Sequence, residues 1–204
     1  MIADRMPAVA SEVRSVSAGA ARRLAAGWAA PPHTVYPDKH MGYVAPMEDN
    51  AALITRFYEA FSKRDHAGMA ACYSDDANFS DPVFPALHGA KVGGMWRMLC
   101  ERGGDLELTF SDVKGTASGG SAHWEARYTF SATGRKVHNI IDATMTIRDG
   151  KIVEHTDVFD FYRWSKMALG VSGLLLGWTP IVRNKVRGQA GAQLDKFCAK
   201  NGIA

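Results

Sequence analysis

Three aspartates lie where the neighbouring sequence is apolar. Asp81, in the stretch YSDDANFSDPVFP, is followed by a proline and two apolar residues. Asp142 interrupts the run IIDATMTI, and Asp157 follows His155 at a spacing of two. A carboxylate removed from water has its pKa raised. When two carboxylates lie close together, their pKa values move apart, so that one of them keeps its proton near neutrality. Such a set predicts acid/base chemistry in which one carboxylate is the base and another is a hydrogen-bond donor.

Helical periodicity in residues 47–101 predicts the first elements that position these groups. A helix that contains Leu53 and Phe61 can begin at Asp49 or Asn50, both good N-cap residues. A second helix is expected over 67–73 and a third over 89–101, with extended chain between them because Pro82 and Pro85 disfavour helix.

After Gly104 the apolar period changes from 3.6 to 2. Four strands are expected, separated by the turn sequences GTASGG, TGR and RDG. Their sequences are LELTFSDVKG, SAHWEARYTFSA, KVHNIIDATMTIRDG and KIVEHTDVFDFYRW. Helices followed by an antiparallel meander predict an α+β domain in which a curved sheet folds over the helices.

Strand alternation predicts which side chains meet in this domain. His155, Asp157 and Phe159 share one face of the last strand, and Trp124 and Tyr128 belong to an aromatic row two strands earlier. Asp142 faces opposite to the row formed by Ile141, Ala143, Met145 and Ile147. If the aromatic row, Asp142 and the His155 face all lie on the concave side, they form an apolar pocket with two or three carboxylates, as expected of a small-molecule site.

The motifs RFYEAFSKRDHAGMAACYSDDANFSDP and IIDATMTIRDGKIVEH, in this order, resemble SnoaL-like and ketosteroid isomerase-like proteins of the nuclear transport factor 2-like superfamily. The resemblance covers about residues 48–165 and implies a cone-shaped fold, a hydrophobic ligand and no cofactor. It also implies that Asp81 is the general base and Asp142 the protonated acid at the oxyanion. Phe57 stands where the isomerases have a catalytic tyrosine, which removes half of the oxyanion hole.

Two related families imply other roles for the last strand. Asp157 resembles the last-strand aspartate of limonene epoxide hydrolase, but Trp124 and Ala126 stand near the positions of its other two catalytic residues. His155 and Asp157 also resemble the acid/base region of SnoaL-type polyketide cyclases. Isomerase, cyclase and hydrolase chemistry on a steroid, terpenoid or polyketide-like molecule therefore all stay open.

Structural interpretations compete with each of these roles. Asp81 before proline can cap a turn, and His155 can be a satisfied core histidine or part of a dimer face. The remaining residues predicted to contact the substrate can equally be wall or core; they are Phe57, Tyr73, Trp96, Trp124, Tyr128 and Phe159. His123 and His138 lack partners at a metal-ligand spacing, so we expect no metal. The alternative to an enzyme is a non-catalytic ligand-binding or dimerisation module.

Composition limits the class of protein. Hydrophobic residues make up 47% of the 204-residue chain, which is ordinary for a globular protein with a real core. Scattered basic residues and a net charge of +3 argue against nucleic acid. The odd set of Cys72, Cys100 and Cys198 favours free thiols in the cytoplasm over disulfides. The apolar stretch 167–182 is short and interrupted by glycine and proline, so no membrane span is expected.

The chain is expected to divide into three parts. Residues 1–46 form an extension that is disordered, a transit segment, or translated sequence ahead of a start at Met47. Residues 47–165 form the cone domain, for which the resemblance implies a homodimer. Residues 166–204 form a helical extension that covers the mouth of the cone or lies against a second subunit, because Leu174 and Trp178 look exposed.

Overall fold

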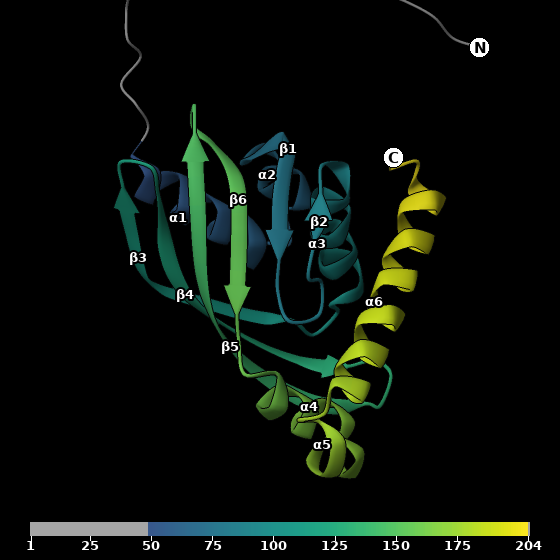
Figure 1. Cartoon of the computed structure of the whole chain (residues 1–204). Coiled ribbons are helices and arrows are strands. Elements are labelled where there is room, and N and C mark those ends of the chain that lie inside the picture. The colour runs from purple at the N-terminus through teal and green to yellow at the C-terminus, as the bar shows by residue number, and fades with distance from the viewer. Residues whose placement is uncertain (1–48, 204) are drawn as a thin grey trace, which may run out of the picture. The chain divides into compact units, whose positions relative to one another are not determined.

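The computed structural model describes residues 49–203, so the predicted extension 1–46 lies outside the described residues. Helices come first, strands follow, and helices return at the C-terminus (Figure 1). The elements are α1 (Asn50–Ser62), α2 (His66–Ala71), β1 (Tyr73–Ser80), β2 (Leu87–His88), α3 (Ala90–Arg102), β3 (Glu107–Thr116), β4 (Gly119–Phe130), β5 (Arg135–Arg148), β6 (Lys151–Val158), α4 (Phe161–Leu169), α5 (Val171–Leu176) and α6 (Pro180–Asn201).

The strands form one curved sheet in the order β2-β1-β6-β5-β4-β3. The predicted meander of four strands is confirmed, because β3 to β6 pair antiparallel with their chain neighbours. The sheet as a whole is mixed rather than antiparallel, because β1 pairs parallel to β6. This parallel contact is long-range, and no hairpin signal could have predicted it.

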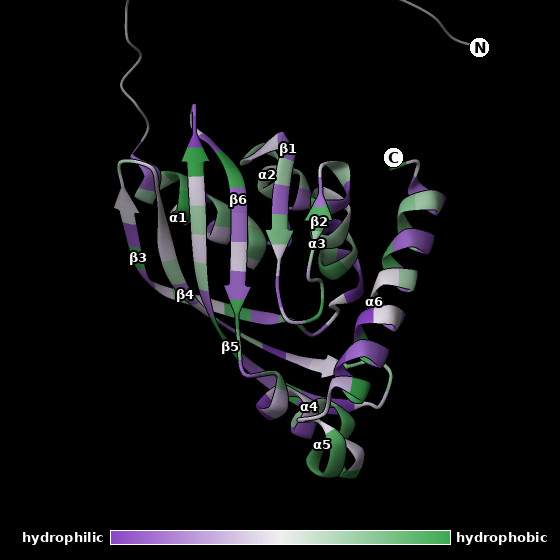
Figure 2. Ribbon diagram, in the orientation of Figure 1, coloured by the Kyte–Doolittle hydropathy of each residue, from purple (hydrophilic) through white to green (hydrophobic). Residues whose placement is uncertain are grey.

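The concave face of the sheet carries the core. Trp124 of β4 pairs with Ile141 of β5, and Ala143 of β5 pairs with Asp157 of β6, so these side chains share the inner face. Helix α1 buries Leu53 and Phe57 completely, and Ile141, Ala143 and Met145 of β5 are buried as well. Full burial of a large apolar side chain of this kind contributes roughly 1.5–3 kcal/mol to the stability of the fold. Figure 2 shows hydrophobic and hydrophilic residues following one another along strands such as β1. The α+β cone predicted from the sequence is therefore the observed fold.

Strand β6 ends earlier than the sequence predicts. It stops at Val158, and the Asp160 carboxylate accepts a hydrogen bond of 3.0 Å from the backbone N–H of Arg163. Asp160 thereby caps α4, so the chain turns into a helix where a continued strand was expected. Trp164 consequently projects from a helix.

The predicted C-terminal helices are present, and α6 packs along α3. Gly94 of α3 allows this close approach, because a Cβ on this residue would lie 2.7 Å from the Sγ of Cys198. Leu194 and Phe197 of α6 are buried in the same core. Helix α6 therefore lies beside the open end of the sheet and becomes part of the site described next.

Candidate functional site

A cavity of about 280 Å³ opens between α3, β4, α6 and the turn that follows β1. Its wall is mostly apolar and aromatic, as is usual for small-molecule sites. The lining residues used below are Asp81, Arg102, Trp124, Tyr128, Phe159, Trp164 and Gln193.

The turn after β1 holds Asp81 in the wall of this cavity. Its Oδ1 accepts hydrogen bonds from the backbone N–H groups of Val83, at 2.6 Å, and of Phe84. The Nε of Arg187 in α6 donates to the carbonyl oxygen of Pro82 at 2.9 Å, which ties the turn to the C-terminal helix. Asp81 thus caps a turn and faces the cavity at once, so its two competing interpretations are compatible.

Burial raises the pKa of Asp81 to about 7. The two backbone N–H groups act in the opposite direction because they stabilise the charged form. The charge of Asp157 raises this pKa further, and that of Arg187 lowers it. A carboxyl group with a pKa near neutrality can both accept and return a proton at physiological pH.

A second polar group of the cavity wall is the hydroxyl of Tyr128. It accepts a hydrogen bond of 2.9 Å from the indole Nε1–H of Trp164. Because an indole nitrogen only donates, the Tyr128 hydroxyl keeps its own hydrogen to give to a bound molecule. Burial raises the pKa of Tyr128, the Trp164 bond lowers it, and the charge of Asp81 raises it. Tyr128 therefore offers a neutral donor in the same cavity as Asp81.

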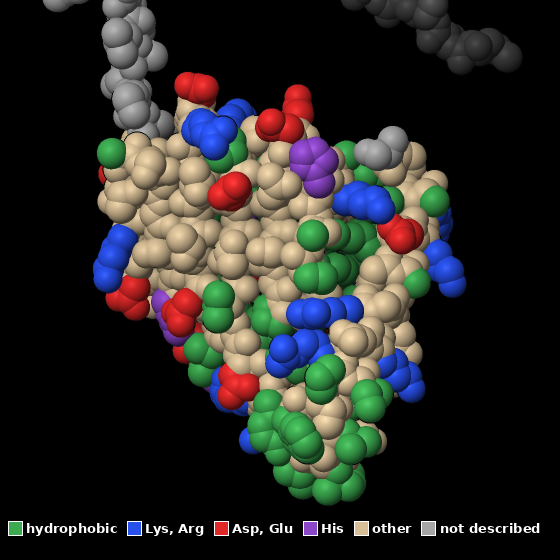
Figure 3. Space-filling model, in the orientation of Figure 1, with side chains coloured by type: hydrophobic (Ala, Val, Ile, Leu, Met, Phe, Trp, Pro, Cys, Tyr) green, Lys and Arg blue, Asp and Glu red, His purple; other side chains and the backbone are tan. Residues whose placement is uncertain are grey.

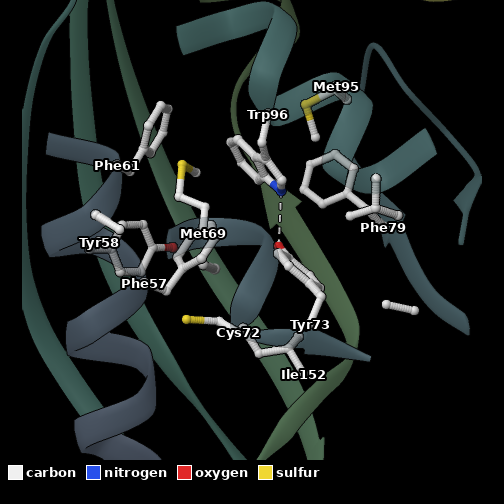
Figure 4. Packing of buried hydrophobic residues seen from close by; sticks show 14 of the residues in the cluster. Phe57, Tyr58, Phe61, Met69, Cys72, Tyr73, Phe79, Met95, Trp96 and Ile152 are labelled. Carbon is white, nitrogen blue, oxygen red and sulfur yellow. Dashed lines mark hydrogen bonds between the residues drawn. The ribbon is translucent and has the colours of Figure 1, made fainter. Parts of the chain in front are cut away.

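Beneath the cavity lies a buried chain of five hydrogen-bonded side chains. Trp96 Nε1 donates to the hydroxyl of Tyr73 at 3.0 Å, as the dashed line in Figure 4 shows. This hydroxyl lies 2.5 Å from His155 Nδ1, and His155 Nε2 lies 3.0 Å from Asp157 Oδ1. Trp124 Nε1 donates to the same Asp157 oxygen at 3.3 Å. Only Trp124 belongs to both this chain and the cavity wall.

The two tryptophans fix the direction of every bond in the chain. Since Trp96 donates to Tyr73, the Tyr73 hydroxyl gives its own hydrogen to His155 Nδ1, and Nε2–H then donates to Asp157. His155 is 1% exposed, and its ring lies 5.2–6.1 Å from four aromatic rings, those of Phe57, Tyr73, Phe79 and Trp96. The geometry matches a satisfied core histidine, and burial also raises the pKa of Tyr73.

The prediction that Asp142 faces the pocket is wrong. Its side chain is 81% exposed on the outer face of the sheet, where its Oδ1 lies 2.8 Å from His123 Nδ1. In β5 the inner row consists of the buried residues Ile141, Ala143 and Met145, and alternation sends Asp142 to the other side. Asp142 therefore takes no part in the candidate site.

The other predicted residues divide into two layers. Trp124, Tyr128 and Phe159 line the cavity. Phe57, Tyr73 and Trp96 are buried in the core and are not part of the cavity wall (Figure 4). Among residues 49–203, no group of three or more His, Cys, Asp or Glu side chains is arranged to hold a metal ion.

Three residues of the cavity wall were not predicted from the sequence, namely Arg102, Trp164 and Gln193. Arg102 Nη1 lies 3.3 Å from Gln193 Oε1, a contact between α3 and α6 that spans 91 positions. Trp164 entered the wall because α4 begins where a strand was expected. Aspartate is a common N-cap residue, so Asp160 was the one sequence signal that a helix containing Trp164 could begin here.

Comparisons with known proteins agree with this fold. The sequence model described as a SnoaL-like domain matches residues 54–155. No curated protein gives a significant match. Among solved structures, a candidate polyketide cyclase from Silicibacter sp. TM1040 is 20% identical, with 59% of this chain and 96% of that chain covered and a TM-score of 0.52.

Two further structures give similar values. An NTF2-like protein of unknown function from Burkholderia pseudomallei is 20% identical, with 60% of this chain and 98% of that chain covered and a TM-score of 0.53. The candidate hydroxylase AclR from Streptomyces galilaeus is 20% identical, with 64% and 98% covered and a TM-score of 0.50. At this identity the likenesses show a shared fold.

Proposed function

Since this chain belongs to the SnoaL-like family, we propose that it is an enzyme that binds a small hydrophobic molecule in the cavity and transfers a proton on it, with Asp81 as the base. The observation that carries this proposal is the carboxyl group of Asp81 in an aromatic wall with its pKa raised to about 7. Polyketide cyclase and hydroxylase descriptions among proteins of this fold favour a ketone or polyketide-like substrate.

The proposed step needs no cofactor. Asp81 takes a proton from the carbon next to a carbonyl group, the electron pair of the broken C–H bond moves to form an enolate, and Asp81 becomes the neutral acid. Both backbone hydrogen bonds of the carboxylate use Oδ1, which leaves Oδ2 to take the proton. Return of the proton to another carbon isomerises the molecule. Alternatively, the enolate carbon attacks a second carbonyl carbon and closes a ring; the π electron pair of that C=O bond moves to its oxygen, and the resulting alkoxide takes the proton from Asp81.

Tyr128 is the proposed donor to the enolate oxygen. A hydrogen bond that strengthens as negative charge develops lowers the barrier in a site from which water is excluded. The Trp164 indole polarises the Tyr128 hydroxyl by donating to it. Tyr128 would thereby supply the hydrogen bond that Phe57 cannot. His155 and Asp157 act as positioning residues, because Asp157 fixes the indole of Trp124 in the wall.

The pH dependence of turnover tests the role of Asp81. With a substrate found by screening ketones, epoxides and polyketide-like compounds, kcat/KM is expected to rise about tenfold per pH unit below pH 7 and to level off above it, because only ionised Asp81 accepts a proton. A kcat/KM that is constant from pH 5 to 8 contradicts this role. A compound that binds in the cavity without turnover would support the non-catalytic binding module instead.

Replacing Tyr128 with Phe tests the donor. Loss of one such hydrogen bond costs on the order of 100-fold in kcat, and KM should change little, because the enolate exists only after proton removal. Tyr162→Phe is the matched control, since the Tyr162 hydroxyl donates to the carbonyl oxygen of Leu174 outside the cavity. An unchanged kcat in Tyr128→Phe would remove Tyr128 from the proposed mechanism.

A further inference from the structure

The segment between α4 and α6 carries an exposed apolar surface, here called the apolar tip. Six large apolar side chains of the tip are 53–79% exposed, and only two others among residues 49–203, Leu99 and Val158, are also exposed. Figure 3 shows this surface as a cluster at one end of the described domain. The apolar tip consists of Val171, Leu174, Leu175, Leu176, Trp178 and Ile181.

Close packing behind the tip holds these side chains outward. Gly173 is buried against α4, and a Cβ there would collide with the carbonyl oxygen of Ser165. Gly173 faces α4, and the three leucines that follow it are 53–64% exposed. Trp178 Nε1 donates to the carbonyl oxygen of Leu175 at 3.2 Å, which fixes the indole beside them. The exposure is therefore a property of a well-packed structure.

The segment that carries the tip is cationic. Residues 161–194 contain no Asp or Glu but five basic residues. Within residues 49–203, no salt bridge joins any of these five to an acidic side chain. The five are Arg163, Lys166, Arg183, Lys185 and Arg187. A projecting apolar surface within a cationic segment matches the chemistry of an anionic lipid surface, where apolar groups enter the acyl region and cations meet the headgroups.

We propose that the apolar tip docks this protein onto an anionic membrane surface. A second copy of the chain is a poorer fit, because pairing tip to tip would bring two cationic segments together. In this proposal the side chains of the tip enter the interface of the bilayer. No helix among residues 49–203 combines the length and apolar character needed to cross a bilayer.

The position of the tip suggests what docking achieves. Helix α4 runs into the tip, and its Trp164 lines the cavity together with Phe159. A hydrophobic molecule dissolved in the membrane would thus lie close to the cavity when the tip is inserted. This delivery role rests on the proposed function, whereas the docking itself does not.

Vesicle co-sedimentation of the full chain tests the docking. Wild-type protein is expected to bind phosphatidylcholine vesicles that contain about 30% phosphatidylglycerol and to bind pure phosphatidylcholine at least about tenfold more weakly. The double variant Leu175→Ser/Ile181→Ser should lose about tenfold or more of the binding to anionic vesicles, because both side chains are exposed and would enter the bilayer. Lys185→Gln should lose roughly fivefold.

Val158→Ser is the matched control, because Val158 is 60% exposed on β6 and does not belong to the tip. It should bind vesicles as the wild type does, and so should Asp81→Asn, whether or not Asp81 is catalytic. Vesicle binding that survives in the double variant would overturn the proposal. A dimer in sedimentation velocity that only the double variant dissociates would also overturn it and assign the tip to a second copy.

Discussion

Asp81→Asn is expected to lower turnover by at least about 100-fold, because an amide cannot accept the substrate proton. Its Oδ1 can still accept the hydrogen bonds from Val83 and Phe84, so the turn after β1 should keep its shape. The variant therefore separates the two functions of this residue. Steady-state kinetics with the screened substrate measures the loss, and circular dichroism checks the fold.

The same variant is expected to be more stable than the wild type at high pH. The pKa of Asp81 is about 7 in the folded protein and near the ordinary 3.8 in the unfolded chain. Below about pH 4 the carboxyl group is protonated in both the folded and the unfolded protein, so it does not change the free energy of unfolding. Between pH 4 and 7 the unfolded state loses its proton first, so this group lowers stability as pH rises, by up to about 4 kcal/mol above pH 7.

Urea unfolding at two pH values measures this effect. Because Asn carries no charge, the stability gained by Asp81→Asn at pH 8 should exceed that gained at pH 5 by roughly 2.5 kcal/mol. Asp142→Asn is the matched control, since Asp142 is 81% exposed and should leave both stability and turnover unchanged. If the gain from Asp81→Asn is the same at both pH values, the carboxyl group is not desolvated in solution.

Asp157→Ala is expected to destabilise the fold by about 3–5 kcal/mol. The substitution leaves His155 Nε2–H and Trp124 Nε1–H without their acceptor, and an orphaned buried donor costs about 1–3 kcal/mol. A small cavity adds to this loss. Urea unfolding at pH 7 measures the change in the free energy of unfolding.

Asp157→Asn is the comparison for this variant. Its amide oxygen can take the position of Oδ1 and accept both hydrogen bonds, so the loss should be smaller by at least about 1 kcal/mol. Equal stability of Asp157→Ala and wild type would show that the buried chain does not hold the core together.

Local sequence patterns predicted most of the fold, because helices, turns and hairpins depend on interactions between residues that are close in the sequence. The turn sequences between the strands predicted the meander, since each hairpin pairs two strands that are adjacent in the sequence. The pairing of β1 with β6 joins Phe79 to His155 across 76 positions, and a sequence pattern does not encode such a contact.

Strand alternation and the resemblance to isomerases predicted opposite faces of the sheet for Asp142. Alternation alone put Ile141, Ala143 and Met145 in one apolar row and therefore put Asp142 on the opposite face. The resemblance to isomerases assigned it an oxyanion role, which required the inner face. The apolar row was the better guide, because a one-residue change of register would have exposed every one of those side chains.

The cavity wall could be predicted only in part. Asp81, Trp124 and Tyr128 belong to the turn and strand that the sequence indicated. Arg102, Trp164 and Gln193 come from helices that reach the cavity through tertiary packing, and their own sequence positions carry no signal of it.

The buried chain ends in an indole N–H on both sides, at Trp96 and at Trp124. Neither indole nitrogen can accept a proton, so the chain has no proton acceptor at either end. Of the five members only Trp124 also lines the cavity, and its indole N–H already donates to Asp157, so this chain offers Asp81 no acceptor for its proton. We therefore expect the proton of Asp81 to return to the bound molecule or to leave through the cavity mouth that admits this molecule.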